Sequence, residues 1–313
     1  MPIRIPDDLP ARKILEAEGV AVMDSSRAAR QDIRPLQFGL LNLMPNKERT
    51  ETQFARLVGA SPLQIDFTLV RISDHKAKNT SEDYLNTFYS KWEEIRDRRF
   101  DGLIVTGAPI AHIPFEEVRY WPEMVEIMNW TQTNVHSTLF ICWGVQAALY
   151  HFHGVLRKRR REKAVGIYRH QNMRPNSPYL RGFSDDFAIP VSRHNDIDRS
   201  TLPDDGSLEV LIDSNEVGIC MLEDHKHRAL YMLNHFEYDN RSLADEYARD
   251  IKAGLAPALP VNYFPDDDPT REPLNVWRSH SHLFFQNWIN EIYQTTPYDM
   301  AKIGTPDGEN EWL

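Results

Sequence analysis

The sequence predicts an α/β protein with a doubly wound, mostly parallel sheet and helices on both faces. Through the first half of the 313-residue chain, apolar runs typical of strands alternate with segments of helical pattern, which is typical of βαβ units. One apolar run, at 138–141, ends abruptly at Cys142; a small residue follows two positions later, and helix-forming residues then begin. This pattern indicates a nucleophile elbow, in which a buried strand carries a reactive side chain onto a tight turn at the start of a helix.

Each element of the first half follows from a local apolar pattern. Ser81 is expected to cap one helix, because its side chain can accept a hydrogen bond from a free amide of the first turn. In chain order we predict a strand at 36–43, a helix at 48–58, a strand at 63–72, a helix at 81–98, a strand at 103–106, a helix at 115–131 despite Pro122, and the strand at 138–141.

The second half is less regular. Three runs predict a strand meander, with Cys220 as a packed side chain in the middle of the second strand, and two segments predict helices; the strands are at 208–212, 217–222 and 229–233, and the helices at 241–253 and 281–293. No clean boundary divides the chain. We therefore predict an N-terminal extension at 1–35, one catalytic domain at 36–303 and a loose polar tail at 304–313.

Composition excludes several classes of protein. The net charge of −10 argues against a nucleic-acid partner. No apolar run approaches 18 residues, and the N-terminus has no apolar core of a signal peptide. Two cysteines do not make a disulfide framework. We expect a cytoplasmic protein that spans no membrane.

A basic cluster stands out against the acidic background: Arg157, Lys158, Arg159, Arg160 and Arg161, with Lys163 close behind. Such runs are most often solvated loops, and the functional alternative is a counter-charge for a ligand that carries phosphate.

The second chemical element is His235 with Glu237, directly after the predicted strand at 229–233. If the chain stays extended, the two side chains lie on the same face. A histidine held by a carboxylate can take the proton of a cysteine thiol, and the carboxylate fixes its tautomer. With Cys142 at an elbow, these residues predict a catalytic triad.

The third element is the loop that begins at Gly107, at the end of a strand. Ligands of such sheets bind beyond the carboxyl ends of the strands, at a switch point. A glycine there lets backbone amides approach a reacting atom. We predict that the amide of Gly107 or Ala108 and the amide of Trp143 form an oxyanion hole; an ordinary turn is the alternative.

Metal binding is the competing explanation for the histidines. Two alternating pairs, His151 with His153 and His280 with His282, have no cysteine or acidic partner at a usual zinc spacing. We therefore predict neither a metal nor a cofactor.

Together these features resemble the class I glutamine amidotransferase-like (flavodoxin-like) fold. Within it, several segments resemble the homoserine O-acyltransferases of methionine biosynthesis, across nearly the whole of 1–303; they lie at 1–6, 41–45, 101–109, 262–265 and 277–280, besides the elbow. Amidotransferases usually carry a glycine two residues before the cysteine, where this chain has Phe140. That departure favours the acyltransferases.

The resemblance implies acyl transfer from acyl-CoA to the hydroxyl of L-homoserine through a Cys142 thioester, the first committed step of methionine biosynthesis. It maps Lys163, Ser192 and Arg249 to substrate binding, and a guanidinium suits an amino-acid carboxylate. Lys47 is expected to contact acyl-CoA. A homodimer is expected from the family alone. A glutamine amidotransferase subunit or a non-catalytic protein of this fold are the alternatives; glutaminase activity would mark the first, and the presence of all three triad residues argues against the second.

In this family the position of Ala111, together with Ser192, is associated with the choice of acyl donor. Glutamate at the first position goes with acetyl-CoA and glycine with succinyl-CoA. A glutamate would repel the distal carboxylate of a succinyl group. Ala111 is small and uncharged, so we expect succinyl-CoA, with acetyl-CoA as the alternative.

Overall fold

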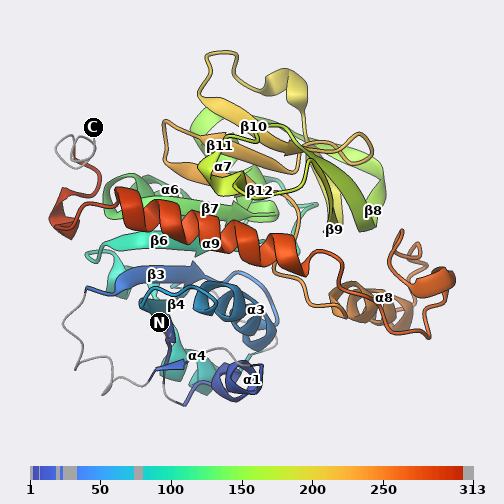
Figure 1. The fold of residues 1–313 in the computed structure, drawn as a ribbon, viewed down its shortest axis with the longest axis horizontal. Coiled ribbons are helices and arrows are strands. Elements are labelled where there is room, and N and C mark those ends of the chain that lie inside the picture. The colour runs from blue at the N-terminus through green and yellow to red at the C-terminus, as the bar shows by residue number, and fades with distance from the viewer. Residues whose placement is uncertain (1–2, 7, 19–21, 24–33, 74–79, 306–313) are drawn as a thin grey trace.

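The structure is a computed structural model that describes residues 3–6, 8–18, 22–23, 34–73 and 80–305. Its described residues form one twelve-stranded sheet with helices packed against it (Figure 1). The strands are β1 (Ile3–Arg4), β2 (Val22–Met23), β3 (Leu36–Leu41), β4 (Ile65–Arg71), β5 (Ser90–Lys91), β6 (Phe100–Val105), β7 (Val135–Ile141), β8 (Arg157–Asn172), β9 (Asp186–Ile197), β10 (Leu208–Asp213), β11 (Met221–Asp224) and β12 (Ala229–Met232). The α-helices are α1 (Ala11–Ala17), α3 (Lys47–Gly59), α4 (Glu82–Phe88), α5 (Trp92–Ile95), α6 (Trp121–Asn134), α7 (Trp143–His153), α8 (Ser242–Lys252) and α9 (Arg278–Thr295).

The strand order confirms the predicted mostly parallel sheet. The order is β2-β1-β4-β3-β6-β7-β12-β11-β10-β8-β9, and β5 pairs with β4 at the side of this path. The pairs from β2 to β12 are parallel, whereas the pairs from β12 to β9 are antiparallel. The chain adds β4 on one side of β3 and then β6 on the other. This reversal makes a switch point between β3 and β6, where a ligand crevice is expected.

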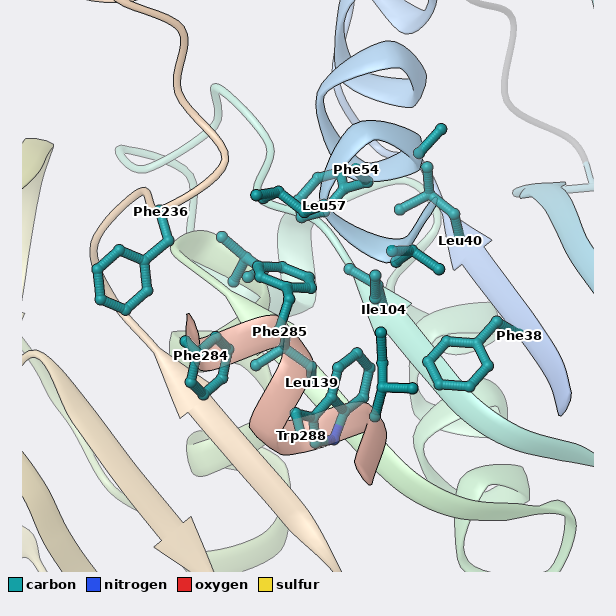
Figure 2. Packing of buried hydrophobic residues seen from close by; sticks show 14 of the residues in the cluster. Phe38, Leu40, Phe54, Leu57, Ile104, Leu139, Phe236, Phe284, Phe285 and Trp288 are labelled. Carbon is teal, nitrogen blue, oxygen red and sulfur yellow. The ribbon is translucent and has the colours of Figure 1, made fainter. Parts of the chain in front are cut away.

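Helices cover both faces of the parallel strands, as predicted. Side chains alternate along a strand, so Ile104 of β6 packs with α3 and α9 on one face, and Leu103 packs with α6 and α7 on the other. Figure 2 shows the first face, where Phe284, Phe285 and Trp288 of α9 meet apolar residues of the strands and of α3. None of the described helices, α9 included, is both long and apolar enough to cross a membrane.

Two predicted helices need correction. The segment predicted as one helix at 81–98 is divided into α4 and α5, because Tyr89 turns extended and the next two residues pair with β4 as β5. Ser81 caps α4 as expected, accepting a hydrogen bond from the Tyr84 amide. The helix predicted at 115–131 begins only at Trp121, after a short 3₁₀ turn, because Pro122 fits the first turn of a helix but not its interior.

The second half also departs from prediction. The meander of β10, β11 and β12 is confirmed, but β11 begins at Met221, so the buried Cys220 precedes the strand instead of lying in its middle. The sequence analysis missed the long antiparallel hairpin of β8 and β9. The basic cluster is therefore the start of a strand and not a loop. Charged residues suit it there because the outer strands of a sheet leave one face to water.

The ends of the chain bear on the predicted division into segments. Within the predicted N-terminal extension, β1 pairs with β4 and β2 pairs with β1, so two short strands widen the sheet. Of the predicted tail at 304–313, residues 306–313 lie outside the described residues. The division into an extension, a catalytic domain and a tail stays a prediction.

The packing of Trp288 generates a prediction about stability. Its fully buried ring meets the ring of Phe38 edge-on at 5.4 Å between centroids, and its indole N–H donates to the Ser137 hydroxyl at 3.0 Å. Replacing it with alanine leaves a large cavity between α9 and the sheet. We expect Trp288→Ala to lower the free energy of unfolding by about 3–5 kcal/mol. Urea unfolding measures this, with Tyr293→Ala, at a half-exposed position of the same helix, as the control that should change it by less than about 1 kcal/mol. Equal effects of the two variants would contradict the packing.

Candidate active site

Cys142 lies between the end of β7 and the start of α7, as the elbow pattern predicted. Its backbone has φ 52° and ψ −109°, a conformation that side-chain-bearing residues rarely adopt. Such strain is typical of a nucleophile held at a sharp turn. Its amide donates to the carbonyl of Met232 at 2.9 Å. The parallel pairing of β7 with β12 therefore continues one step past the strand and fixes the position of the thiol.

Two glycines let the elbow fit against β6. A Cβ atom at Gly144 would lie 3.0 Å from the carbonyl oxygen of Thr106 and 3.1 Å from that of Val105. A Cβ atom at Gly107 would lie 3.0 Å from the Cβ of Cys142. Backbone atoms cannot yield to such contacts as a flexible side chain can. The small residue after the nucleophile and the glycine after β6 are therefore required by close packing.

His235 reaches the same end of the sheet through the neighbouring strand. β12 ends at Met232, and three residues later the His235 side chain lies 95% buried. Its Nδ1 is 2.6 Å from Oε1 of Glu237. The predicted pairing of these two side chains is present, but the chain between them is not extended as expected. The chain turns after His235, with the Tyr238 amide bonded to the His235 carbonyl, and the turn rather than an extended strand brings Glu237 to the ring.

A polar network holds this turn in place. The His235 amide donates to the carbonyl of Pro190, and its ring stacks on Tyr238 at 4.1 Å between centroids. The preceding residue, Asn234, accepts a hydrogen bond from the buried guanidinium of Arg193 and contacts His170 at 2.7 Å. His235 thus sits on a loop that Pro190, Arg193 and His170 attach to β8 and β9, the hairpin that sequence analysis missed.

The electrostatics of His235 suit a proton carrier. Burial alone would lower its pKa, but its interactions with Glu237 and Cys142 outweigh burial and raise the pKa to about 10. Its Nε2 is buried and has no hydrogen-bond partner among the described residues. Catalytic hydrogen bonds are often loose before a substrate binds. The interactions with Glu237 and Cys142 therefore favour the protonated ring at neutral pH.

Cys142 and His235 line one cavity of about 390 Å³, at the switch point. Most predicted site residues line it with them: Gly107, Ala108, Ala111, Lys163, Ser192 and Arg249. The cavity is also lined by Arg159 of the basic cluster and by Met44, Pro109, His112, Gln146, Arg193, His194, Tyr238 and Glu246. Glu237 lies behind the His235 ring, where a residue that orients the base belongs.

The predicted oxyanion donors have the right surroundings. A Cβ atom at Gly107 would lie 3.5 Å from the Trp143 amide nitrogen, so the two backbone segments meet beside the thiol. No described residue accepts a hydrogen bond from the amides of Gly107, Ala108 or Trp143. The Trp143 amide belongs to the first turn of α7, where a helix favours negative charge.

Glu246 connects the predicted substrate residues. Lys163 forms an ion pair with its carboxylate, and the Ser192 hydroxyl donates to its Oε1 at 2.8 Å. Arg249 lies one helical turn further along α8 and pairs with the adjacent Asp250. The sequence offered a signal, because positions 246 and 249 share one face of the predicted helix, but nothing in the local sequence shows that this face meets β8 and β9.

Lys47 does not line the cavity. Its ammonium group is buried at the start of α3 and donates to the carbonyls of Asn42 and Met44, near the ring of Tyr89. Burial lowers its pKa to about 8. The described contacts make it an anchor for the loop after β3, and its expected contact with acyl-CoA stays a prediction.

The loop that carries Ala111 is anchored by the hairpin. The carbonyl of Ala111 accepts a hydrogen bond from the Asn195 side chain at 2.8 Å. Asn195 on β9 pairs with Arg159 on β8, and paired residues of antiparallel strands point to the same face. Arg159 therefore stands beside the Ala111 loop. Of the basic cluster, only Arg159 and Lys163 line the cavity.

The histidine pairs differ in their surroundings. His153 does have an acidic partner, contrary to the expectation from spacing: its Nε2 is 2.6 Å from the buried Asp224, which His227 also contacts. The donor atoms of these three residues lie within 4.8 Å of one another. Two such groups occur among the described residues, and neither contains His280 or His282. The absence of a metal stays a prediction.

The fold and the cysteine elbow place the protein in a known class of α/β folds. The structure is similar to that of a glutamine amidotransferase from Methylobacillus flagellatus, with a TM-score of 0.51 over 83% of this chain and 95% of that one, at 14% identity. This likeness confirms the predicted class I glutamine amidotransferase-like fold, here with a cysteine elbow and a buried histidine–glutamate pair.

Sequence comparison assigns the chain to one family within this fold class. The family model described as homoserine O-succinyltransferase matches residues 2–298, and the chain belongs to this family. It is 70% identical to a homoserine O-succinyltransferase from Pelagibacterium halotolerans over the full length of both chains. It is 60% identical to a homoserine O-acetyltransferase from Rhizobium johnstonii, over 97% of this chain and 99% of the relative. The predicted resemblance to homoserine O-acyltransferases is confirmed.

The pKa of His235 generates a prediction about pH. Because the folded-state pKa of about 10 exceeds the ordinary value of 6.5, the folded protein holds this proton more tightly than the unfolded chain does. The stabilisation is complete below about pH 6.5 and is lost as the pH rises toward 10. Between these limits we expect the free energy of unfolding to fall by about 4 kcal/mol more in the wild type than in His235→Gln. Urea titrations across this range measure the difference, and parallel curves for the two proteins would refute the raised pKa.

Proposed function

We propose that this protein transfers a succinyl group from succinyl-CoA to the hydroxyl of L-homoserine, through a thioester on Cys142. The observation that carries the proposal is the single cavity shared by the strained Cys142 elbow and His235, in a chain of the homoserine O-succinyltransferase family. The reaction would be an early step of methionine biosynthesis. Nucleophile, base and oxyanion donors all come from the chain, so the chemistry calls for no cofactor.

The first half-reaction acylates the enzyme. The Cys142 sulfur attacks the thioester carbonyl of acyl-CoA, and the carbonyl oxygen becomes an oxyanion held by the amides beside Gly107 and Trp143. The tetrahedral intermediate collapses by breaking the bond to the CoA sulfur. His235 donates its proton to the departing CoA, and the enzyme is left as a Cys142 thioester with a neutral imidazole.

The second half-reaction uses the same groups in reverse. The homoserine hydroxyl attacks the Cys142 thioester while His235 takes its proton. The intermediate expels the Cys142 thiolate, which reforms its pair with the imidazolium, and O-acylhomoserine leaves. Acylation itself prepares this step. It replaces the Cys142 thiol with a thioester and so removes the interactions with that thiol that raise the pKa of His235, which leaves the imidazole free to act as a base.

Substrate binding follows the charges of the cavity. Arg249 projects from α8 with its side chain 68% exposed, and a guanidinium can bind the homoserine carboxylate through two parallel hydrogen bonds. Anchored groups on β8 and β9 form the opposite wall. The family relationship supports L-homoserine and acyl-CoA as the two substrates. A homodimer is expected, and light scattering after gel filtration would test it.

Ala111 supports succinyl-CoA as the donor. It lines the cavity near Cys142 and places no negative charge against a distal carboxylate. Arg159 stands beside this loop and lines the same cavity, where its guanidinium would be a counter-charge for that carboxylate. The relative from Pelagibacterium halotolerans also bears the succinyltransferase name. Acetyl-CoA is the second candidate, because the relative from Rhizobium johnstonii is named an acetyltransferase and a roomy pocket admits a smaller group.

The covalent mechanism predicts the effect of removing the thiol. Cys142→Ala should lower kcat by at least about 10³-fold while the protein stays folded, because no other group can carry the acyl chain. CoA release with succinyl-CoA and homoserine measures turnover, and intact-mass spectrometry of the wild type incubated with succinyl-CoA alone should show one added acyl group. Cys220→Ala, at a buried position away from the cavity, should keep both signals. More than a tenth of wild-type activity in Cys142→Ala would exclude the acyl-enzyme.

Donor choice predicts a switch at position 111. The wild type should show at least about tenfold higher kcat/KM with succinyl-CoA than with acetyl-CoA. Ala111→Glu should reverse this preference, because a carboxylate in a partly desolvated pocket repels the succinyl end by a few kcal/mol, on the order of 10²-fold. Ala111→Gln has similar bulk without charge and separates repulsion from crowding. A wild-type preference for acetyl-CoA, left unchanged by Ala111→Glu, would reject succinyl-CoA as the donor.

A further inference from the structure

Acylation of Cys142 fixes the direction in which CoA leaves. In the proposed mechanism the acyl tail of the donor extends toward Ala111, and His235 gives its proton to the CoA sulfur, so the sulfur departs on the His235 side. Tyr238 forms the cavity wall there, with its ring stacked on the His235 ring at 4.1 Å between centroids. Glu246 lines the same cavity, and burial together with this nearby carboxylate raises the pKa of Tyr238. The rest of the CoA molecule therefore continues past Tyr238 and Glu246.

A second cavity, of about 630 Å³, begins at this wall. It shares Lys163, His194 and Glu246 with the active-site cavity, and the ion pair of Lys163 with Glu246 lies at the boundary between the two spaces. Lys163 reaches this boundary because the pairing of β8 with β9 shifts register between Arg159 and Ala164, and such a bulge re-aims side chains. Its volume lies within the range of about 300–1,000 Å³ that is usual for small-molecule sites.

The lining of the second cavity suits an uncharged chain with apolar and amide groups. Among the described residues that line it, the carboxylates of Glu162, Glu246 and Asp250 outnumber the one ammonium group, that of Lys163. Such walls repel phosphate. The pantetheine arm of CoA carries no charge, and its amide N–H groups can donate to carboxylates. The remaining walls are apolar or aromatic: Val165, Tyr247, Leu255, Ala256, Pro257, Ala258 and Pro260.

The outer wall of the second cavity, residues 255–260, is held against β8 by backbone hydrogen bonds. The Ile167 amide donates to the carbonyl of Val261 at 2.7 Å, and the Val261 amide donates to the carbonyl of Val165 at 3.0 Å. Gly166 permits this close approach, because a Cβ atom there would overlap the backbone of Val261. The wall is therefore in place before a ligand binds, and a pre-formed site loses less entropy on binding.

We propose that the second cavity binds the pantetheine arm of acyl-CoA, while the adenine nucleotide stays outside it. The inference rests on the proposed function and deepens it by giving the leaving half of the donor a site. The arm crosses the boundary between Lys163 and Glu246 during acylation of Cys142, and free CoA leaves by the same route before homoserine binds. The two substrates use this boundary in turn, which a covalent mechanism permits.

The test compares succinyl-CoA with the succinyl thioester of N-acetylcysteamine, which keeps the reacting thioester and lacks most of the arm. Ala258→Trp places an indole ring at an exposed position of the outer wall and narrows the second cavity. It should lower kcat/KM for succinyl-CoA by at least about tenfold, because the arm loses its contacts with the cavity. For the truncated thioester, wild type and Ala258→Trp should agree within about threefold, which also shows that the variant is folded.

Ala253→Trp is the matched control. Ala253 directly follows α8 at an exposed position that lines neither cavity, so the same ring is added close by. It should leave kcat/KM for both donors unchanged. S-methylpantetheine, which can neither donate nor accept an acyl group, should compete with succinyl-CoA in the wild type and at least about tenfold more weakly in Ala258→Trp. If Ala258→Trp does not fold, Ala256→Trp narrows the same wall.

The outcomes separate two kinds of failure. An equal loss on both donors in Ala258→Trp would mean that this wall acts on Cys142 or on homoserine binding, and it would overturn the inference. Unchanged kinetics with succinyl-CoA would overturn it as well, as would a wild type that uses the truncated thioester as efficiently as succinyl-CoA. A wild type in which neither thioester acylates Cys142 would instead reject the proposed function.

Discussion

The parallel pairing of β7 with β12 is the constraint on which the active site depends. These strands are neighbours in the sheet although they lie far apart in the chain, and Ile141 at the end of β7 pairs with Met232 at the end of β12. The hydrogen bond from the Cys142 amide to the Met232 carbonyl is the last rung of this ladder. Because both strands run in the same direction, each delivers its next residues to the same edge. Cys142 follows one strand, and His235 follows the other.

Rigidity on both sides of the cavity has a common origin in close packing. The elbow is strained, and such strain persists only where its surroundings leave no alternative. Gly144 and Gly107 bring α7 and the loop after β6 within contact distance of the Cys142 turn. On the other side, Arg193 and Asn234 anchor the turn that carries His235. Trp288 and Phe285 of α9 pack against the apolar residues of the same sheet (Figure 2).

Charged groups have different roles in two regions of the cavity. Near Cys142, a buried histidine keeps its proton because two interactions outweigh the effect of burial on its pKa. Further out, β8 and α8 face each other across the substrate space, and the ion pair of Lys163 with Glu246 joins them. The same carboxylate thus contributes to the contact between α8 and the hairpin and to the surface that a substrate meets. The acidic net charge of the chain gives no hint of this cationic pocket, because the pocket collects its arginines and lysine from separate elements.

The sequence by itself predicted the class of fold, the elbow at Cys142 and the pairing of His235 with Glu237, all of which the structure contains. These depend on local signals: alternation of strands with helices, an apolar run that ends at a thiol, and a histidine two residues before a carboxylate. It also indicated the oxyanion loop at Gly107, and resemblance supplied Lys163, Ser192 and Arg249. Only the tertiary structure decided that a turn joins His235 to Glu237, that the basic cluster begins a long strand, that Asp224 meets His153, and that Glu246 faces the cavity. Each of these depends on which distant segments pair, and the free energy of such pairing is set by packing across the sheet, which no local pattern records.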